Sequence, residues 1–267
     1  MTTQDTRQLA LITGASAGIG EGFARRLAKD NYNLILVARR RERLDALAKE
    51  LSAATGTSCE IIAADLAKDE DVSVVEQRLQ RGDIDLLINN AGFGTFGAFA
   101  TLPIGRELEE LDVNVRALMR LSHAALGPMT EHGRGGIINV ASSAGFQPVP
   151  FNATYSATKA FVLHFTEALH EEARDQGVRV TCLCPGPVKT EFQEVSGLDA
   201  QALPSFSWVS VDTVVDDALS ALRHGRAIAL PGTVNALTAS SVRFVPSFLV
   251  RRISASMFRN QGHGRQA

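Results

Sequence analysis

Short apolar runs alternate with segments of helical periodicity along most of this 267-residue chain. Seven runs are expected to form strands, at residues 9–13, 33–38, 60–63, 85–89, 136–141, 178–184 and 226–230. Several are apolar at nearly every position, as strands covered on both faces are. Helices are expected at residues 18–30, 41–54, 69–81, 102–132 and 153–176. This alternation predicts an α/β fold with a doubly wound parallel sheet and helices on both faces of the sheet.

The expected strands extend to residue 230 and leave no room for a second domain, so residues 1–267 are expected to form one domain. Residues 191–210 interrupt the alternation and are interpreted as an irregular lid over the substrate. Residues 233–260, after the last expected strand, are interpreted as a basic helical extension.

Charge is distributed unevenly along the chain. The formal net charge is −2, yet residues 218–267 carry seven Arg and no Asp or Glu, so residues 1–217 carry −9. Residues 242–258 combine bulky apolar residues with arginines, and a basic amphipathic helix can lie on an anionic membrane. The favoured interpretation is instead a helix docked on the acidic body or on a second subunit. The nearly balanced overall charge argues against a nucleic-acid partner.

Cysteine usage and the amino-terminal sequence bear on location. The three cysteines, Cys59, Cys182 and Cys184, are too few for a disulfide framework and suit a reducing compartment. No His pair stands at metal-ligand spacing from them, so no metal site is expected. The first residues lack a basic segment followed by a long apolar stretch, and no signal peptide is expected. A cytoplasmic location is predicted.

Two long segments, 86–105 and 135–158, carry no charged residue. Each is long enough to be tested as a membrane span, but Asn, Gly, Thr, Ser or Pro interrupts it. Segments that are free of charge but polar more often line a buried groove, which is the favoured interpretation.

A glycine-rich turn joins the first expected strand to the first helix, in the sequence Thr-Gly-Ala-Ser-Ala-Gly-Ile-Gly at 13–20. Small residues allow the backbone to approach a pyrophosphate, and the free N–H groups of a helix N-terminus favour an anion. The spacing is Gly-x-x-x-Gly-x-Gly rather than the commoner Gly-x-Gly-x-x-Gly. The candidate phosphate-binding residues are Gly14, Ser16, Gly18, Ile19 and Gly20.

The end of the second expected strand bears on which dinucleotide binds. A cofactor with a free ribose 2′-hydroxyl usually meets Asp or Glu there, but this chain has Ala38 followed by Arg39, Arg40 and Arg41. A guanidinium suits a 2′-phosphate, and cations in the first turn of a helix are unfavourable unless an anion binds there. The sequence therefore favours NADP(H) over NAD(H), with Arg39 and Arg40 at the phosphate. An ordinary solvated helix start is the alternative.

A tyrosine and a lysine stand one helical turn apart in Tyr-Ser-Ala-Thr-Lys at 155–159. Because positions i and i+4 share a helix face, the ammonium of Lys159 is expected to lower the pKa of the Tyr155 phenol below its usual value of about 10. Such a phenol can exchange a proton with a carbonyl/alcohol pair. Ser142 lies just past an expected strand, at the sheet edge where ligands bind, and could hold a carbonyl oxygen. Taken singly, each motif has an alternative interpretation as a turn or a helix pair.

With these motifs the sequence resembles the short-chain dehydrogenase/reductase family. The matching segments are, in order, Thr-Gly-x-x-x-Gly-Ile-Gly at 13–20, Asp65, Asn-Asn-Ala-Gly at 89–92, Asn114, Ser142, Tyr-x-x-x-Lys at 155–159 and Pro-Gly-x-Val-x-Thr at 185–190. The resemblance implies a Rossmann-type domain with a seven-stranded sheet, and NAD(P)-dependent oxidoreduction of a carbonyl/alcohol pair. It also implies a homodimer or homotetramer formed through the helices at 102–132 and 153–176.

The resemblance further implies roles for individual residues. Tyr155 would be the acid/base, Lys159 would lower its pKa and hold the nicotinamide ribose, and Ser142 would orient the substrate. Asn114 would anchor a water molecule for proton relay. The other cofactor contacts that it implies are Asp65, Leu66, Asn90, Ala91, Gly92, Pro185, Gly186, Val188 and Thr190.

One position departs from the family pattern. Many NADP-using members carry a basic residue just before the middle glycine of the first turn, where this chain has Ala17. The 2′-phosphate assignment therefore rests on Arg39, Arg40 and Ser16.

The substrate pocket is expected to be apolar. Its candidate wall residues are Phe93, Phe96, Phe146, Phe151, Phe192, Phe206 and Trp208. About half of them are expected to be core residues instead. Neither charge-free segment contains Arg or Lys, which argues against a small carboxylate substrate, although Lys189 lies near in sequence. An apolar ketone or aldehyde is the favoured substrate class.

These observations predict NADPH-dependent reduction of a ketone or aldehyde, reversible as alcohol oxidation, with Tyr155 as the proton donor or acceptor. The alternative is a catalytically silent dinucleotide-binding regulator or scaffold on the same fold. The presence of Asn114, Ser142, Tyr155 and Lys159 together argues against this alternative, because a sensor needs no proton donor.

Overall fold

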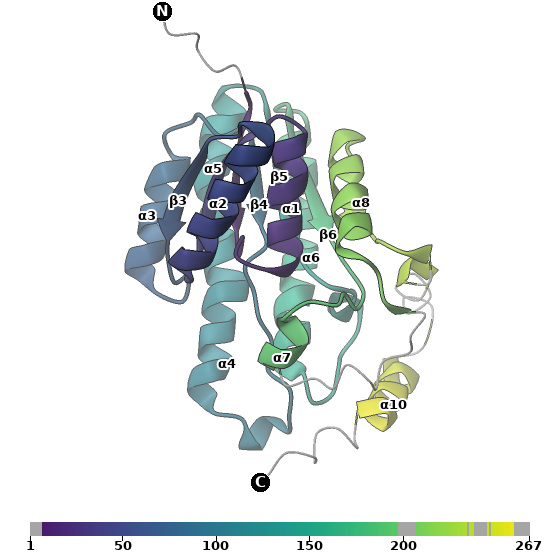
Figure 1. Ribbon diagram of the computed structural model, residues 1–267. Helices are drawn as coiled ribbons and strands as arrows, with labels where there is room; N and C mark the ends of the chain where they lie inside the picture. Colours follow the sequence, from purple (N-terminus) through teal and green to yellow (C-terminus); the bar gives the residue numbers. More distant parts are fainter. Residues whose placement is uncertain (1–6, 197–206, 234, 238–244, 246, 259–267) are drawn as a thin grey trace, which may run out of the picture.

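Seven parallel strands form one sheet at the centre of the protein (Figure 1). The computed structural model describes residues 7–196, 207–233, 235–237, 245 and 247–258. The strand order is β3-β2-β1-β4-β5-β6-β7. The strands are β1 (Leu9–Thr13), β2 (Asn33–Ala38), β3 (Cys59–Ala63), β4 (Leu86–Asn89), β5 (Gly135–Val140), β6 (Val178–Leu183) and β7 (Ile228–Ala229). This confirms the predicted doubly wound, seven-stranded Rossmann-type sheet.

Helices cover both faces of the sheet, so each central strand is buried on both sides. One layer contains α1 (Gly18–Lys29), α2 (Arg41–Thr55) and α8 (Val211–Arg223), and the other contains α3 (Asp69–Leu79), α5 (Leu118–Glu131) and α6 (Ala153–Arg174). In β2, Leu36 packs in the core with α1 and α2, whereas its neighbour Val37 packs in the core on the opposite face. This double coverage explains why these strands are apolar at consecutive positions.

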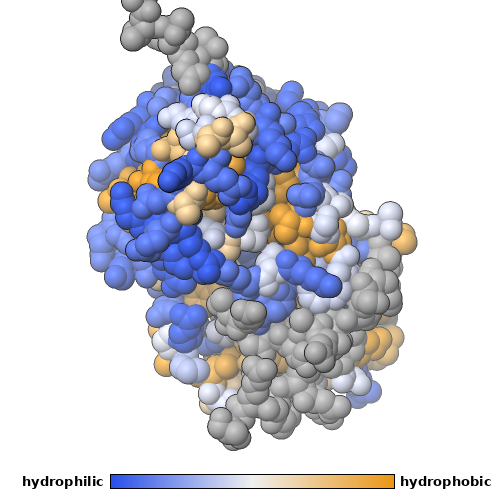
Figure 2. Space-filling model, viewed as in Figure 1, coloured by the Kyte–Doolittle hydropathy of each residue, from blue (hydrophilic) through white to orange (hydrophobic). Residues whose placement is uncertain are grey.

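Helix α2 is amphipathic, with its apolar residues turned toward the sheet. Leu44, Leu47 and Leu51 are buried, at the spacing of one helix face. The outer surface of this helix is accordingly mostly hydrophilic (Figure 2). The helix ends at Thr55, and its C-cap is Gly56, whose positive φ of 70° suits glycine.

The long helix expected at 102–132 is divided by a wider turn. Helix α4 (Ile104–Leu111) leads into a π-helical turn, η2 (Asp112–Ala117), and then into α5. Single π-helical turns of this kind occur frequently at functional sites. The short 3₁₀ helices η1 (Phe99–Thr101) and η3 (Ser143–Phe146) follow the ends of β4 and β5.

The structure differs from the sequence prediction in the last third of the chain. Helix α8 was not predicted, and the last strand spans Ile228–Ala229 rather than residues 226–230. The expected lid at 191–210 begins with a short helix, α7 (Phe192–Ser196), and its residues 197–206 lie outside the described part of the chain. The expected basic extension contains α10 (Ser247–Phe258). Among the described helices, none combines the length and the apolar character that a membrane crossing requires.

The sheet places one crevice at its carboxyl edge. Strand β1 lies between β2 and β4, so the chain continues from β1 to one side and later returns to pair β4 on the other side. The turns after β1 and β4 therefore diverge, which is where ligands bind in open α/β sheets.

Candidate active site

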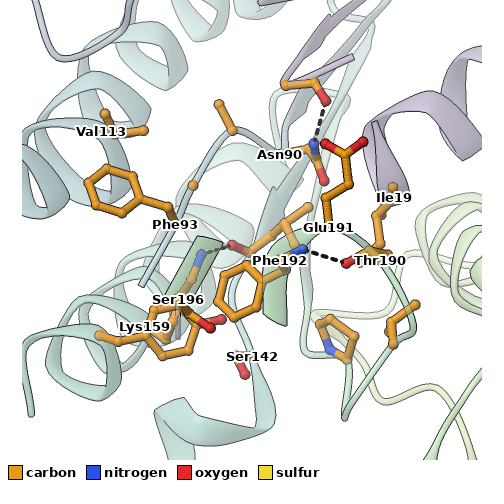
Figure 3. A pocket seen from close by; sticks show the side chains of 18 of the residues that line it. Ile19, Asn90, Phe93, Val113, Ser142, Lys159, Thr190, Glu191, Phe192 and Ser196 are labelled. Carbon is orange, nitrogen blue, oxygen red and sulfur yellow. Dashed lines mark hydrogen bonds between the residues drawn. The ribbon is translucent and has the colours of Figure 1, made fainter. Parts of the chain in front are cut away.

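A cavity of about 970 Å³ lies at the carboxyl ends of the strands. Its lining comes from the turns after β1, β2, β3 and β4, from η3 and α6, and from the segment between β6 and α7. The predicted site residues that line it are Gly14, Ser16, Gly18, Ile19, Arg39, Arg40, Asp65, Leu66, Asn90, Ala91, Gly92, Ser142, Tyr155, Lys159, Pro185, Gly186, Val188 and Thr190. Residues from seven separated segments therefore share one cavity (Figure 3).

The glycine-rich turn is shaped for close approach by a ligand. Gly14 and Gly18 have positive φ values of 67° and 58°, which side-chain-bearing residues rarely adopt. A Cβ atom at Gly14 would lie 2.7 Å from Nδ2 of Asn90 and 3.0 Å from Cα of Ala91. Helix α1 begins at Gly18 without a side-chain cap, so N–H groups of its first turn lack a side-chain acceptor. The turn therefore fits the pyrophosphate of a dinucleotide.

Gly20 is the exception among the predicted glycines. It does not line the cavity, and a Cβ atom there would overlap the carbonyl oxygen of Gly14. Its position allows helix α1 to pack closely against the turn, rather than allowing the backbone to approach a ligand.

Arginines lie at the end of β2, as predicted, but with an additional partner. Nη2 of Arg40 donates a hydrogen bond to Oγ of Ser16 at 3.3 Å. Arg40 and a further arginine, Arg43, both form ion pairs with Glu191. The side chain of Arg41, by contrast, pairs with Asp45 on its own helix. Neither Arg43 nor Glu191 was predicted from the sequence as a site residue.

The end of β4 is tied to the glycine-rich turn. Nδ2 of Asn90 donates hydrogen bonds to the carbonyl oxygens of Thr13 and Gly14, at 2.9 Å and 3.4 Å. A Cβ atom at Gly92 would lie 2.9 Å from Oδ1 of Asn114 and 3.3 Å from Nζ of Lys159. The absence of a side chain at Gly92 therefore lets the chain pass close to Asn114 in η2 and to Lys159 in α6.

Asn114 is buried in the π-helical turn and acts as a brace. Its Nδ2 donates hydrogen bonds to the carbonyl oxygen of Phe93 at 2.8 Å and to Oγ1 of Thr158 at 3.1 Å, and its Oδ1 accepts one from the Phe93 N–H. The side chain connects the segment after β4 to helix α6. It does not line the cavity itself.

Tyr155, Lys159 and Ser142 meet at the wall of the cavity, and Figure 3 shows Lys159 and Ser142 there. Nζ of Lys159 donates a hydrogen bond of 2.9 Å to the carbonyl oxygen of Val140 and lies 5.6 Å from the centre of the Tyr155 ring. Oγ of Ser142 accepts a hydrogen bond from the Ala144 N–H. Helix α6 supplies the phenol and the ammonium, and the end of β5 supplies the hydroxyl.

The expected lowering of the Tyr155 pKa is not observed. Burial raises the pKa of Tyr155 to about 12, with a smaller lowering from its hydrogen bond to Ser142 and a further increase from the charge of Glu110. Burial also lowers the pKa of Lys159 to about 8. The prediction counted only the attraction between an ammonium and a phenolate, and it omitted the cost of removing both charges from water.

A pair of buried carboxylates, Glu107 and Glu110, lies behind these residues and was missed. Both are almost inaccessible, at 3% and 0% exposure. Oγ1 of Thr95 lies 2.6 Å from Oε1 of Glu107 and 3.1 Å from Oε2 of Glu110, and the hydroxyl of Thr154, near the start of α6, hydrogen-bonds to Glu107. Oε1 of Glu110 has no hydrogen-bond partner among the described residues. Burial, together with the nearby charge of Glu107, raises the pKa of Glu110 to about 7.

The expected substrate wall is only partly present. Phe93, Phe96, Phe146 and Phe192 line the cavity, and the Phe192 ring lies 5.4 Å from that of Tyr155. Other predicted wall residues are placed elsewhere. Phe151 does not line the cavity but has a positive φ in a turn, and Trp208 packs 5.9 Å from Nζ of Lys189 instead. Phe206 lies outside the described residues.

The cavity also contains a charged pair that the sequence did not indicate. Cζ of Arg106, on α4, lies 4.4 Å above the ring of Phe93, and its guanidinium is paired with Glu109. Both side chains line the cavity. Arg106 directly follows the first charge-free segment, residues 86–105, so the pocket wall carries a cation that this segment itself does not.

Comparison with known proteins assigns the fold and the motifs to a family. A family model described as short chain dehydrogenase matches residues 8–200. The very-long-chain 3-oxoacyl-CoA reductase of Anas platyrhynchos is 31% identical over 215 residues, which cover 79% of this chain and 67% of the duck protein.

Solved structures agree along nearly the whole chain. A short-chain dehydrogenase from Sphingobium yanoikuyae in complex with NADPH has a TM-score of 0.83 and 32% identity, covering 97% of this chain and 98% of the other. A bulky-bulky ketone specific alcohol dehydrogenase from Comamonas testosteroni has a TM-score of 0.78 and 31% identity, covering 97% of each chain. Similar structures include complexes with NADPH or NADP, and a 3-ketoacyl-(acyl-carrier-protein) reductase from Brucella melitensis is complexed with NADH.

Proposed function

This chain belongs to the short-chain dehydrogenase/reductase family of oxidoreductases, and on that premise we propose that it reduces an apolar ketone or aldehyde with NADPH, or oxidises the corresponding alcohol. The observation that carries the proposal is the meeting of Tyr155, Lys159 and Ser142 at the wall of the cavity that the glycine-rich turn also lines. A proton donor and a dinucleotide site in one cavity are what carbonyl reduction requires.

The residues present fit a dinucleotide. The positive φ angles of Gly14 and Gly18 and the uncapped start of α1 suit the pyrophosphate, while Asp65 and Leu66 line the part of the cavity next to β3 and would bracket the adenine. Pro185, Gly186, Val188 and Thr190 line the wall after β6 and would contact the nicotinamide end. When bound, the cofactor supplies the hydride that reduces the carbonyl carbon.

The protein's own groups handle the proton. Tyr155 gives the proton on its phenol oxygen to the carbonyl oxygen of the substrate, and the Ser142 hydroxyl holds that oxygen with a hydrogen bond. A phenol with a pKa of about 12 is protonated near neutral pH, as a proton donor must be. The Lys159 ammonium stabilises the phenolate that remains. We assign to Asn114 the role of anchoring a water molecule that returns a proton to Tyr155.

The preference for NADP(H) rests on the groups at the end of β2. Arg39, Arg40 and Ser16 line the cavity there, and Ala38 stands where an acidic residue would favour a free 2′-hydroxyl. The NADPH bound by the Sphingobium yanoikuyae relative supports this preference. Dissociation constants measured for NADPH and NADH test it directly, and a wild-type protein that binds NADH more tightly would contradict it.

The substrate proposed is a bulky apolar carbonyl compound. Four phenylalanines line the cavity, and apolar, aromatic walls favour apolar ligands. Two relatives support this substrate class, because one is a bulky-bulky ketone specific alcohol dehydrogenase and the duck enzyme is named for a very-long-chain 3-oxoacyl substrate.

We also propose a homo-oligomer in the cytoplasm, as a homodimer or homotetramer. Apolar side chains are exposed on α4 and α6, including Leu108 and Phe161, where a second subunit could cover them. All three cysteines are free, which is consistent with a reducing compartment. Peripheral membrane contact through α10 remains the less favoured alternative, and co-sedimentation with anionic liposomes that is lost on deleting residues 242–267 would support it.

NADPH consumption in the presence of a panel of carbonyl compounds tests the proposed reaction. Aliphatic, aromatic, steroid-like and acyl-thioester ketones should be compared under identical conditions. Turnover is expected with bulky apolar members of the panel. Tight NADPH binding without turnover of any compound would instead support the alternative of a catalytically silent regulator or scaffold.

A further inference from the structure

Glu191 occupies the arginine cluster at the end of β2. Its Oε2 accepts a hydrogen bond of 2.8 Å from Nη1 of Arg40, and its Oε1 accepts one of 2.5 Å from Nη1 of Arg43. Arg40 also donates to Ser16 in the glycine-rich turn. The guanidinium groups of Arg43 and Arg40 lower the pKa of Glu191, so the carboxylate is ionised at neutral pH. Glu191 also lines the cavity, as Figure 3 shows.

Arg40 and Arg43 lie at the N-terminus of α2, where a bound anion is favourable. Arg40 is the N-cap of α2 and Arg43 lies in the first turn, and the helix has no side-chain cap. The partial positive charge of a helix N-terminus disfavours cations in this position. A negative group that binds here compensates both the arginines and the helix end. In this structure the carboxylate of Glu191, which lies 148 residues after Arg43, is that group.

A cofactor 2′-phosphate would need the same guanidinium groups. Carboxylates and phosphates bind Arg through the same N–H donors, and each donor that points at Glu191 is unavailable to another anion. Arg40 and Ser16 line the cavity beside the glycine-rich turn that fits the pyrophosphate. A ribose with a free 2′-hydroxyl brings no charge to this point and does not compete.

Hydrogen bonds within residues 188–193 fold the segment around Glu191. Oγ1 of Thr190 accepts a hydrogen bond from the Phe192 N–H at 3.2 Å (Figure 3), and Gln193 donates to the Val188 carbonyl oxygen at 2.8 Å. While the Glu191 carboxylate is paired with Arg40 and Arg43, its negative charge repels a phosphate that approaches them.

We propose that Glu191 is an internal competitor for the 2′-phosphate site and that it reduces the discrimination of this protein between NADP(H) and NAD(H). The inference rests on the proposed function, because it takes the arginine cluster as the phosphate site. Removing the charge should strengthen the binding of ligands that carry a 2′-phosphate and leave the others unchanged.

The decisive experiment uses 2′,5′-ADP and 5′-AMP, which differ only in the 2′-phosphate, with isothermal titration of the wild type and Glu191→Gln. Glutamine keeps the size of the side chain and removes its charge. We expect 2′,5′-ADP to bind about fivefold more tightly to the variant, because exposed ion pairs of this kind contribute up to about 1 kcal/mol. The affinity for 5′-AMP should stay within about twofold. NADPH and NADH should behave as 2′,5′-ADP and 5′-AMP do.

Glu50 on helix α2, the helix that carries Arg43, provides a matched control. Glu50 forms a similar exposed ion pair with Arg25, also at 2.5 Å, and does not line the cavity. Glu50→Gln should leave both affinities unchanged. Glu191→Ala guards against an effect of the glutamine amide, and the gain for 2′,5′-ADP should shrink in high salt.

Three outcomes would overturn the inference. They are an unchanged affinity for 2′,5′-ADP, a weaker one, or an equal gain for 5′-AMP. A weaker affinity would mean that Glu191 organises the arginines for the phosphate. Failure of the NADP(H) preference itself shows separately, in the wild-type affinities for NADPH and NADH. Loss of 2′,5′-ADP binding in Arg40→Ala would identify the cluster as the phosphate site independently of Glu191.

Discussion

Burial shifts the pKa values of Tyr155 and Lys159 in opposite directions. The pKa of the phenol rises to about 12 and that of the ammonium falls to about 8, because both charged forms lose water. Near neutral pH the phenol keeps its proton and most of the lysine keeps its charge. The pair is therefore prepared for donating a proton, which is the direction that carbonyl reduction requires.

The pH dependence of reduction should follow Lys159. Above its pKa of about 8 the amine becomes neutral and no longer stabilises the phenolate, so proton donation from Tyr155 becomes slower. We predict that kcat/KM for the carbonyl substrate, measured at saturating NADPH, falls as pH rises through 8. A profile that stays level through this range would show that another group controls the proton.

Glu110 should make the protein less stable at higher pH. Its pKa is about 7 when folded and 4.5 in the reference state, so the folded protein binds the proton more tightly than the unfolded chain does. The free energy of unfolding therefore falls as pH rises from 4.5 to about 7 and stays lower above that range. Glu110→Gln removes this titration. Relative to wild type, the variant should gain on the order of 2 kcal/mol between pH 5 and pH 8.

Chemical denaturation at these two pH values provides the measurement. Glu109→Gln is the matched control, because Glu109 is the adjacent residue and its carboxylate is exposed and paired with Arg106. Its difference from wild type should be the same at both pH values. An equal difference for Glu110→Gln would contradict the assignment of a raised pKa.

The residues that the sequence identified are those with fixed spacing to a recognisable partner. Tyr155 and Lys159 are one helical turn apart, and Ser142 follows a predicted strand, so local pattern was enough to place them in one cavity. Glu107 and Glu110 lie in a charged stretch that looks like a solvated helix face, and only packing against Thr95 and the α6 start shows that they are buried. Distant pairs such as Glu191 and Arg43 have no local signal.

At the scale of elements, the glycine-rich turn makes a specific prediction. Gly14→Ala places a Cβ atom at a positive φ, 2.7 Å from Asn90 and 3.0 Å from the Ala91 backbone. We expect the strain to lower stability by about 1 kcal/mol and the distorted turn to weaken NADPH binding at least about tenfold. Differential scanning fluorimetry and titration with NADPH measure the two effects.

Gly56→Ala separates the two effects. Gly56 has a similar φ of 70° at the end of α2, and a Cβ atom there would meet only the end of the Arg7 side chain at 3.4 Å. This variant should lose similar stability and keep its NADPH affinity. Equal loss of affinity in both variants would mean that general strain, rather than the shape of the turn, limits binding.

Helices and strands could be predicted where burial made nearly every residue of a segment apolar. They were harder to predict where apolar and polar residues were mixed. The central strands are apolar on both faces, so their positions followed from composition alone. Helix α8 has a recognisable start, because Oγ of Ser210 accepts a hydrogen bond from the Thr213 N–H, but it follows the irregular segment and was not identified. The π-helical turn at Asn114 adds a residue to a helical turn without changing its apolar period visibly.

For the whole molecule, exposed apolar residues on α4 predict self-association. Ile104, Leu108 and Leu111 are 62%, 54% and 42% exposed and lie on one side of this helix at spacings of four and three residues. We predict a dimer or tetramer by light scattering at micromolar concentration. The double substitution Ile104→Glu and Leu108→Glu should produce monomers, because burying two carboxylates in an apolar contact is costly. A monomeric wild type would contradict the oligomer.

The uneven charge distribution separates the part of the chain that contains the catalytic residues from the basic C-terminal part. The catalytic side chains and the arginine cluster lie in residues 1–217, which carry −9 overall, whereas the +7 region begins within α8. In α10, Val250 and Ser254 are buried while Phe248, Leu249 and Ile253 are exposed. One side of this helix is therefore buried, and the other exposes apolar side chains.

The central claim is that Tyr155 donates the proton in carbonyl reduction. Tyr155→Phe removes the phenol oxygen and leaves the ring that packs against Phe192. Steady-state turnover and NADPH affinity should be measured together on this variant. We predict that NADPH still binds and that turnover falls by about 100-fold or more, the scale of one acid–base group. Turnover close to that of the wild type would contradict the claim.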